Sequence, residues 1–337
     1  MTPQVAGPRE RKLAFVAWLV VCVVWGTTYL AIRVALESVP VALLAGLRWA
    51  AAGMILTAML PLFGERLPPF RTWGAIAVAG FLMAVVGNGG VVWAEQYVAS
   101  GLAAVVVAMV PFWSVLVEAC LPRGERVTRR TVAGLVLGFL GIIVLVWPEL
   151  TLGGQEGRMF VFGVIALQIA CLGWALGTSY TKRHAMNASP FAASATQMLL
   201  SGAMLIGIGT VAGEWSRLTF TTRTAGAMIY LVLIGSIVGY SAYVYALKYL
   251  PVSKVSLYAY VNPIIAVILG AVLLGEPASP RILFAAALVL GGIALVKSSQ
   301  GSGELESVIR DQGSPTPPGP RPQGSGSGDG PFVKDAA

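Results

Sequence analysis

Few charged side chains lie inside the long apolar segments of this sequence, and they are the first candidates for chemistry. Arg33, Arg48 and Glu95 lie near the ends of three such segments, and Glu118 lies near the end of a fourth. A charged group in hydrocarbon is costly, so each of these residues is a candidate for function. We expect the first three to meet as a charge cluster that acts as a gate or as a structural brace.

Each of these residues also has a plain structural interpretation. Arg48 would pair with Glu95 or with backbone carbonyls, or it would contact a substrate carboxylate. Arg33 would extend its head group toward the membrane surface. Glu118, which lies near Arg123, would form an ion pair at the interface or carry a coupling proton. The residues alone leave these alternatives open.

Aromatic and amide side chains in the same segments are the candidates for contact with a substrate. A ring with one polar tip suits a small amphipathic solute. Pro111 and Pro263 are expected to break their helices and to free backbone carbonyls nearby. Packing, or for the asparagines a hydrogen bond between helices, is the alternative. The predicted substrate-binding residues are Trp25, Asn88, Trp113, Trp174, Tyr240, Tyr258 and Asn262.

The sequence lacks the residue sets that most enzymes, metal sites and pumps need. Its one histidine is His184, every aspartate lies beyond residue 310, and its three cysteines stand singly in apolar segments. A catalytic group, a metal cluster or a disulfide framework is therefore not expected. A Gly-x-x-x-x-Gly-Lys-Ser/Thr phosphate loop does not occur, which disfavours an ATP-driven pump. We predict no enzyme activity, no cofactor, no metal and, without a continuous basic face, no nucleic-acid partner.

The composition indicates a membrane protein. Of the 337 residues, 56% are apolar and 11% are charged, and the mean hydropathy is +0.77, whereas a soluble domain carries about 25% charged residues. A spanning helix needs about 20 apolar residues, so we predict an all-α integral membrane protein with ten transmembrane helices. The ten segments are 13–36, 41–63, 72–94, 99–121, 132–148, 159–181, 190–213, 224–248, 253–274 and 280–297.

The basic residues of the short connections predict an orientation. Fourteen lysines and arginines lie on the side of the N-terminus and four lie on the other side. Because cytoplasmic loops carry this excess, we expect an inner or plasma membrane protein with both termini in the cytoplasm. Residues 1–12 form the cytoplasmic N-terminus. Residues 298–337 are rich in Gly, Pro and Ser, and we expect them to be a disordered cytoplasmic tail.

An internal repeat occurs at a spacing of about 151 residues. Its matches are Trp25-Gly26-Thr27-Thr28-Tyr29 with Gly177-Thr178-Ser179-Tyr180, Tyr97 and Pro111 with Tyr249 and Pro263, and Gly124-Glu125 with Gly275-Glu276. Each copy holds five helices, and an odd number means that the copies cross the membrane in opposite directions. We therefore predict two inverted five-helix repeats, 13–150 and 156–297. Repeats of this kind build alternating-access transporters.

The motifs resemble those of the drug/metabolite transporter superfamily, in particular its ten-helix proteins made of two EamA units. The resemblance covers about residues 13–297 and rests on Trp25 to Tyr29, on Arg48, on Pro111 and Pro263, and on the Gly-Glu pairs. It implies a secondary transporter that usually exports amino acids or other small metabolites. The alternative is an exporter of purine nucleosides or cationic drugs.

The resemblance is incomplete in one place. The second copy has Gln197 and Met198 where the first has Arg48, so a role of that arginine would belong to one half only. We expect the partners to be a small-molecule substrate and the lipid bilayer, and we expect a monomer.

Overall fold

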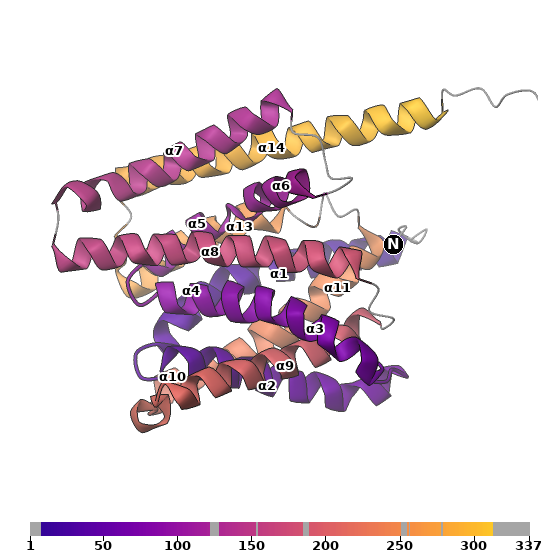
Figure 1. Ribbon diagram of the computed structural model, residues 1–337, viewed down its shortest axis with the longest axis vertical. Coiled ribbons are helices and arrows are strands. Elements are labelled where there is room, and N and C mark those ends of the chain that lie inside the picture. Colours follow the sequence, from indigo (N-terminus) through magenta and orange to yellow (C-terminus); the bar gives the residue numbers. More distant parts are fainter. Residues whose placement is uncertain are drawn as a thin grey trace, which may run out of the picture.

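The structure, a computed structural model, describes residues 8–121, 128–152, 154–184, 189–250, 255, 257–277 and 279–312. In these ranges the regular secondary structure is helical and strands do not occur. Short connections link the helices, as Figure 1 shows. The prediction of an all-α fold is confirmed.

The first half of the chain contributes the elements up to α7. They are α1 (Pro8–Ala35), α2 (Val41–Met59), η1 (Leu60–Phe63), η2 (Phe70–Thr72), α3 (Trp73–Gly80), η3 (Phe81–Asn88), α4 (Gly89–Ala94), α5 (Ser100–Val107), α6 (Val110–Cys120) and α7 (Arg129–Leu152). The second half contributes α8 (Gln155–Arg183), α9 (Pro190–Val211), η4 (Glu214–Arg217), α10 (Thr222–Tyr230), η5 (Leu231–Val238), α11 (Gly239–Tyr249), α13 (Tyr258–Leu274) and α14 (Pro280–Gln312).

The helices occupy the ten positions that the sequence predicts. Eight helical stretches in the described residues are long and apolar enough to cross a membrane, and two shorter apolar helices follow at Tyr258–Leu274 and Pro280–Val296. Several stretches combine consecutive elements, as Phe70–Ala94 combines η2, α3, η3 and α4. We call the end of the bundle where α1 begins the near end, and the end where α1 finishes the far end. The sequence predicts that the near end faces the cytoplasm.

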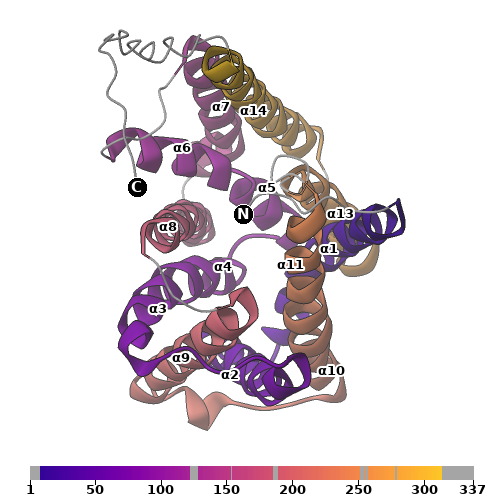
Figure 2. The ribbon, with the colours of Figure 1, turned by 90° about the vertical axis from the view of Figure 1, so that its right-hand side faces the viewer.

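Helix contacts between the halves occur in matched pairs, as an inverted repeat requires. The first helix of each half packs against the third and fourth spans of the other half: α1 against α11 and α13, and α8 against η3 and α6. The second helices, α2 and α9, pack against each other, and so do the fifth helices, α7 and α14. Figures 1 and 2 show α7 and α14 side by side at one edge of the bundle. The chain therefore has the two-repeat fold that the sequence predicts.

Small residues allow the paired helices to approach closely. A Cβ atom at Gly46 of α2 would lie 2.7 Å from the backbone nitrogen of Ile206 in α9. A Cβ atom at Gly134 of α7 would lie 2.6 Å from the carbonyl oxygen of Gly292 in α14. In lipid, where apolar burial between helices gains little, such backbone contact is a main source of association.

The third span of each half contains an eight-residue π-helical segment at the same repeat position. These segments are η3 (Phe81–Asn88) and η5 (Leu231–Val238), 150 residues apart. A π-helical segment widens the helix and is frequent at functional sites. Neither segment is indicated by the pattern of the sequence.

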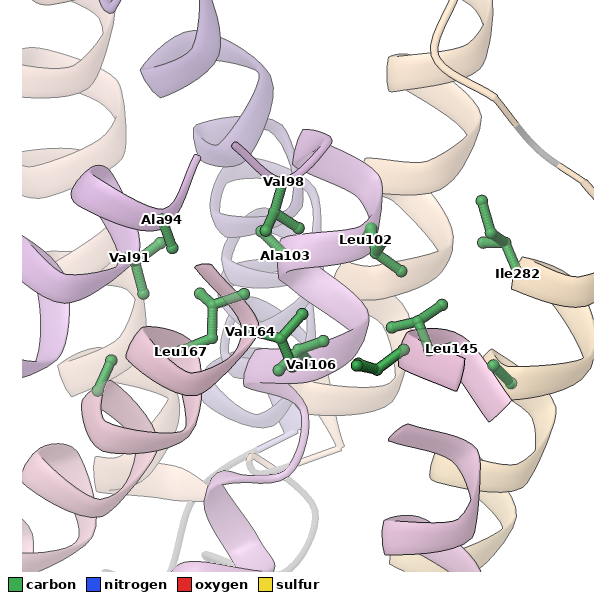
Figure 3. Packing of buried hydrophobic residues seen from close by; sticks show 13 residues of the cluster. Val91, Ala94, Val98, Leu102, Ala103, Val106, Leu145, Val164, Leu167 and Ile282 are labelled. Carbon is green, nitrogen blue, oxygen red and sulfur yellow. The ribbon is translucent and has the colours of Figure 1, made fainter. Parts of the chain in front are cut away.

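An apolar cluster surrounds the far part of α4 and α5. Figure 3 shows Val91 and Ala94 of α4 facing Val164 and Leu167 of α8, with Val106 of α5 beside them. All five side chains are less than 10% exposed. Glu95 follows Ala94 directly, so its carboxylate is withdrawn from water by this cluster and its neighbours.

Two predictions about the chain path need correction. The first concerns Pro263. The helix does not break there, and α13 runs without interruption from Tyr258 to Leu274. A proline removes one helical donor, and here the packing of α13 against α1 holds the helix together. The second correction concerns residues 298–312. The composition predicts them to be part of a disordered tail, and they instead continue α14 as far as Gln312. Residues 313–337 lie outside the described residues.

In the fourth span of the first half, the helix is interrupted. There α5 ends at Val107, and α6 begins at Val110, with Pro111 in its first turn. Proline is well accommodated in the first turn of a helix, where its missing N–H would have had no helical partner. The interruption therefore lies just before Pro111.

Candidate functional site: a buried charge cluster and an aromatic cluster

The structure brings Arg33, Arg48 and Glu95 together toward the far end. Glu95 has no exposed surface and Arg48 is 5% exposed. Arg33 Nη1 donates to the backbone carbonyl of Glu95. Both arginines interact electrostatically with the Glu95 carboxylate in the attractive sense, and Glu276 interacts with it in the repulsive sense.

Arg48 is oriented by the π-helical segment η5. Its Nε donates to Ser236 Oγ at 3.0 Å, and that hydroxyl donates to the carbonyl of Leu231 at 3.0 Å, five residues earlier in η5. A Cβ atom at Gly235 would lie 3.0 Å from Thr28 Cγ2 and 3.5 Å from Arg48 Nη2. The arginine of the first half thus lies against the third span of the second half.

The charge cluster retains hydrogen-bonding capacity that the described residues do not use. Among these residues, Glu95 Oε1 and Oε2 and Arg48 Nη1 are buried and have no hydrogen-bond partner. An unsatisfied buried charge is expensive, and interior polar groups are normally paired. The cluster can therefore accept hydrogen bonds at Glu95 and donate one more at Arg48, which is the pattern that an additional polar molecule would satisfy.

An aromatic cluster of Trp25, Tyr243 and Tyr258 lies toward the near end from the charge cluster. The Trp25 ring is 5.2 Å from the Tyr243 ring and 5.0 Å from the Tyr258 ring, and the two tyrosine rings are 6.0 Å apart. On α1, Trp25 lies one to two turns toward the near end from the residues that contact the charge cluster. Tyr243 is not among the predicted substrate-binding residues, although it lies one helical turn from Tyr240, which is.

The two predicted asparagines bond to other helices. Trp49 Nε1 donates to Asn88 Oδ1 at 3.0 Å, which links α2 to η3. The amide nitrogen of Asn262, in the orientation that satisfies its surroundings, donates to the carbonyls of Tyr258 and Cys22, each at 3.0 Å. These contacts match the structural alternative for both residues.

Three other predicted substrate-binding residues contact other parts of the protein. Trp113 Nε1 donates to Gln168 Oε1 at 2.8 Å. Trp174 lies against η3, where a Cβ atom at Gly87 would be 3.4 Å from its ring. Tyr240 accepts a hydrogen bond from Ser194 near the start of α9. Their contacts are with protein side chains, and their predicted role as substrate contacts stays a prediction.

Glu118 lies at the near end and pairs with a partner distant in sequence. Arg183 Nη2 donates to its Oε2 at 2.8 Å, and Arg183 Nη1 donates to its Oε1 at 3.1 Å. This bidentate pair links α6 to α8. Arg123, the nearer basic residue in sequence, lies outside the described residues. Glu118 is thus separated from the charge cluster by most of the length of the bundle.

A groove of about 540 Å³ opens at the far end between α2, α4 and α9. Trp93, Tyr97 and Arg217 lie along it together with Glu214. Within the described ranges, three or more metal-ligating side chains do not gather at one place.

Both a family profile and an individual relative match most of the chain. The sequence profile of the EamA-like transporter family matches residues 12–147 and, a second time, residues 161–298. The "Uncharacterized inner membrane transporter YedA" of Escherichia coli (strain K12) is 37% identical over 294 residues, which span 86% of this chain and 92% of the relative.

More distant relatives carry names that mention a substrate. The "Probable amino-acid metabolite efflux pump" of Salmonella typhimurium (strain LT2) is 28% identical over 84% of this chain and 94% of its own length. The "Probable terminal-alkyne amino-acid exporter" of Streptantibioticus cattleyicolor is 26% identical over 85% and 94%. A crystal structure with 22% sequence identity superposes with a TM-score of 0.58 over 85% of this chain and 97% of the other, so the two share a fold.

Proposed function

The chain belongs to the EamA-like transporter family, and from that premise we propose that it exports amino acids or closely related zwitterionic metabolites by alternating access. The two repeats, 13–150 and 156–297, are the bodies that rock against each other, and a monomer contains the complete path. The near end faces the cytoplasm, as the excess of basic residues there indicates.

The observation that carries the substrate class is the unused hydrogen-bonding capacity of Arg48 and Glu95. A zwitterionic amino acid has a carboxylate that would accept from Arg48 Nη1 and an ammonium group that would donate to Glu95 Oε1 and Oε2. Each of the two charges of the substrate would therefore meet a protein group of the opposite charge. Binding of this kind satisfies buried groups that otherwise lack partners among the described residues.

The aromatic cluster suits the side chain of such a substrate. Trp25 of α1, Tyr243 of α11 and Tyr258 of α13 offer ring faces on the near-end side of the charged groups. A wall of rings accepts apolar side chains of different shape without a fixed set of hydrogen bonds. The names of the Salmonella and Streptantibioticus relatives, which mention amino-acid export, point in the same direction.

Counterflow in proteoliposomes tests the proposal. Vesicles loaded with an unlabelled amino acid should accumulate the labelled one, and a screen over amino acids, nucleosides and quaternary amines would cover the alternatives. Absence of counterflow for every amino acid would overturn the proposed substrate class.

Substitutions at the charge cluster separate the possible substrates. For a zwitterion, Arg48→Gln and Glu95→Gln should each abolish counterflow, because either change leaves one substrate charge buried without a partner. For a cationic drug, Glu95→Gln alone should abolish transport. For a nucleoside, neither change should remove it. Glu37→Gln is the control, since Glu37 forms an exposed ion pair with Arg223. Folding of each variant is checked by size-exclusion chromatography and thermal unfolding.

A further inference from the structure

Two glutamates of the second half bind the first turns of two helices of the first half. Glu214 Oε2 accepts from the backbone N–H of Leu43 at 2.9 Å, and its Oε1 accepts from that of Ala42 at 3.3 Å. Glu276 Oε1 accepts from the N–H of Ser100 at 2.8 Å, and its Oε2 accepts from the N–H of Gly101 at 3.0 Å. Both contacts lie at the far end.

These carboxylates satisfy helix ends that lack a local cap. The residues before α2 and α5 are Pro40 and Ala99, and neither forms a side-chain capping bond. The first N–H groups of a helix have no partner within it, and the helix dipole favours a negative charge there. Each glutamate therefore holds a helix of the other repeat by two backbone hydrogen bonds.

The same local conformation presents both glutamates. Each follows a glycine with a left-handed backbone, Gly213 with φ 67° and Gly275 with φ 67°, that ends the preceding helix. Glycine accepts this conformation without strain, and it turns the next residue back toward the bundle. At the end of α2, Gly64 has the same conformation, with φ 68°, and Glu65 follows it.

The Gly64-Glu65 pair is the near-end counterpart of Gly213-Glu214. Since α2 and α9 are antiparallel, the end of α2 lies beside the start of α9, where the rings of Phe63 and Phe191 stack at 5.8 Å. By the repeat, Glu65 would bind the N–H groups of Phe191 and Ala192, the second and third residues of α9. In the described residues, however, Glu65 is half-buried and its carboxylate has no hydrogen bond or ion pair.

The start of α9 is instead capped from within its own repeat. Ser189 Oγ accepts from the N–H of Ala192 at 3.2 Å. The far end of the α2 and α9 pair is therefore bonded between the repeats, and the near end of the same pair is not, as far as the described residues extend. The counterpart of Glu276 in the first half, Glu125, lies outside those residues.

We propose that the Gly-Glu pairs are reciprocal latches that select which end of the transporter is closed, an inference that rests on the proposed alternating access. In this conformation Glu214 and Glu276 hold the first turns of α2 and α5 against the second repeat at the far end. When the far end opens, the first turn of α2 leaves Glu214, and a tilt of α2 along α9 brings Glu65 onto the start of α9. The carboxylates thus exchange one set of helix N-terminal bonds for the other.

Distance measurements between spin labels test the latches without any substrate. In a Cys120→Ser background, since Cys120 is the exposed native cysteine, one label pair at positions 37 and 216 reports on the far end. A second pair at the exposed positions 66 and 184 reports on the near end. The double variant Glu214→Gln, Glu276→Gln should raise the far-end-open population about tenfold, since each loses charge-assisted bonds. The near-end distance should shorten in the same molecules.

The third glutamate provides the reverse test. Adding Glu65→Gln to the double variant should return the population toward the far-end-closed state. Glu156→Gln is the matched control, because Glu156 is an exposed far-end glutamate in the first turn of α8 and should change neither distance.

The outcomes keep the two proposals apart. Unchanged distance distributions in the double variant would overturn the latches and leave amino-acid export untouched. Altered distributions in a protein that shows no amino-acid counterflow would support the latches and overturn the substrate class. A change that Glu65→Gln does not reverse would overturn the exchange of latches and show that Glu214 and Glu276 merely brace the far end.

Discussion

The two ends of the bundle are built from the same repeat, but their charged groups are used differently. At the far end, Glu214 and Glu276 are bonded to helix N-termini, and Glu95 is fully buried. At the near end, Glu65 lacks a bond in the described residues, and Glu118 forms a partly exposed pair with Arg183. An inverted repeat supplies equivalent elements at both ends. In a single conformation, the elements at one end form bonds that their equivalents at the other end do not form.

The two halves also differ in the groups that they contribute to the charge cluster. Arg48 of the first half contributes the buried cation, and its repeat positions in the second half hold Gln197 and Met198. Ser236 of the second half supplies the hydroxyl that orients this arginine. The charge cluster is therefore asymmetric, although the helices around it follow the symmetry of the repeat.

The largest loss of stability is expected from a substitution between α2 and α9, which run together from one end of the bundle to the other. A Cβ atom at Gly202 would lie 2.7 Å from the Cα atom of Ala50 and 2.8 Å from its Cβ atom, so Gly202→Ala forces the helices apart. We expect a loss of stability of about 2–3 kcal/mol, measured as a lower Tm in detergent.

The control for this substitution lies on the same helix. A Cβ atom added at Gly207 would meet no other atom within 4 Å, so Gly207→Ala should be neutral or stabilise by about 0.5–1 kcal/mol. Equal effects at the two glycines would show that the α2 and α9 contact does not limit stability and cannot couple the ends.

A smaller effect is expected within the far-end contact of Glu276. Ser100 Oγ donates to Glu276 Oε2 at 3.0 Å, and Ser100→Ala removes this bond while it leaves both backbone bonds in place. The expected loss is about 1 kcal/mol in thermal unfolding, with a small rise in the far-end-open population. Ser216→Ala, which removes an exposed bond inside its own loop, should have no measurable effect. If the two variants behave alike, the far end is not held by these bonds.

The smallest effect is expected at the near end. Glu118→Gln weakens the pair with Arg183, whose side chains are 16% and 35% exposed. Partly solvated pairs contribute little, so we expect a Tm within about 2 °C of the wild type and transport within about twofold. Complete loss of transport would instead assign Glu118 to ion coupling and would reverse the contrast between the ends.

Part of the candidate site could be predicted from the sequence. Arg33, Arg48 and Glu95 stand out because charged residues in apolar segments are rare, and the length of each segment gives their depth. Their assembly at one end follows from the direction of each helix. Tyr243 and Gln168 could not be selected in this way, because polar and aromatic residues also serve packing, and only the neighbouring helices decide between the two uses.

Other features depend on contacts between residues far apart in the chain. Arg183, 65 residues from Glu118, supplies its partner, whereas proximity along the chain indicated Arg123. The break expected at Pro263 does not occur, because α13 is supported along its length by α1. In both cases the local pattern led to a wrong or incomplete prediction, since tertiary packing outweighs a single local preference.

The sequence by itself determined the number of spans, their inverted repetition and the scarcity of interior charge. These properties follow from hydrophobic length and from the position of each charged residue along the chain, so they need no knowledge of neighbours. Only the tertiary structure decided which carboxylates cap which helices, because the N–H groups of α2 and α5 receive Glu214 and Glu276 across more than 170 residues. Such bonds depend on how two helices of different repeats are aligned, which is a property of the folded bundle and of its conformational state.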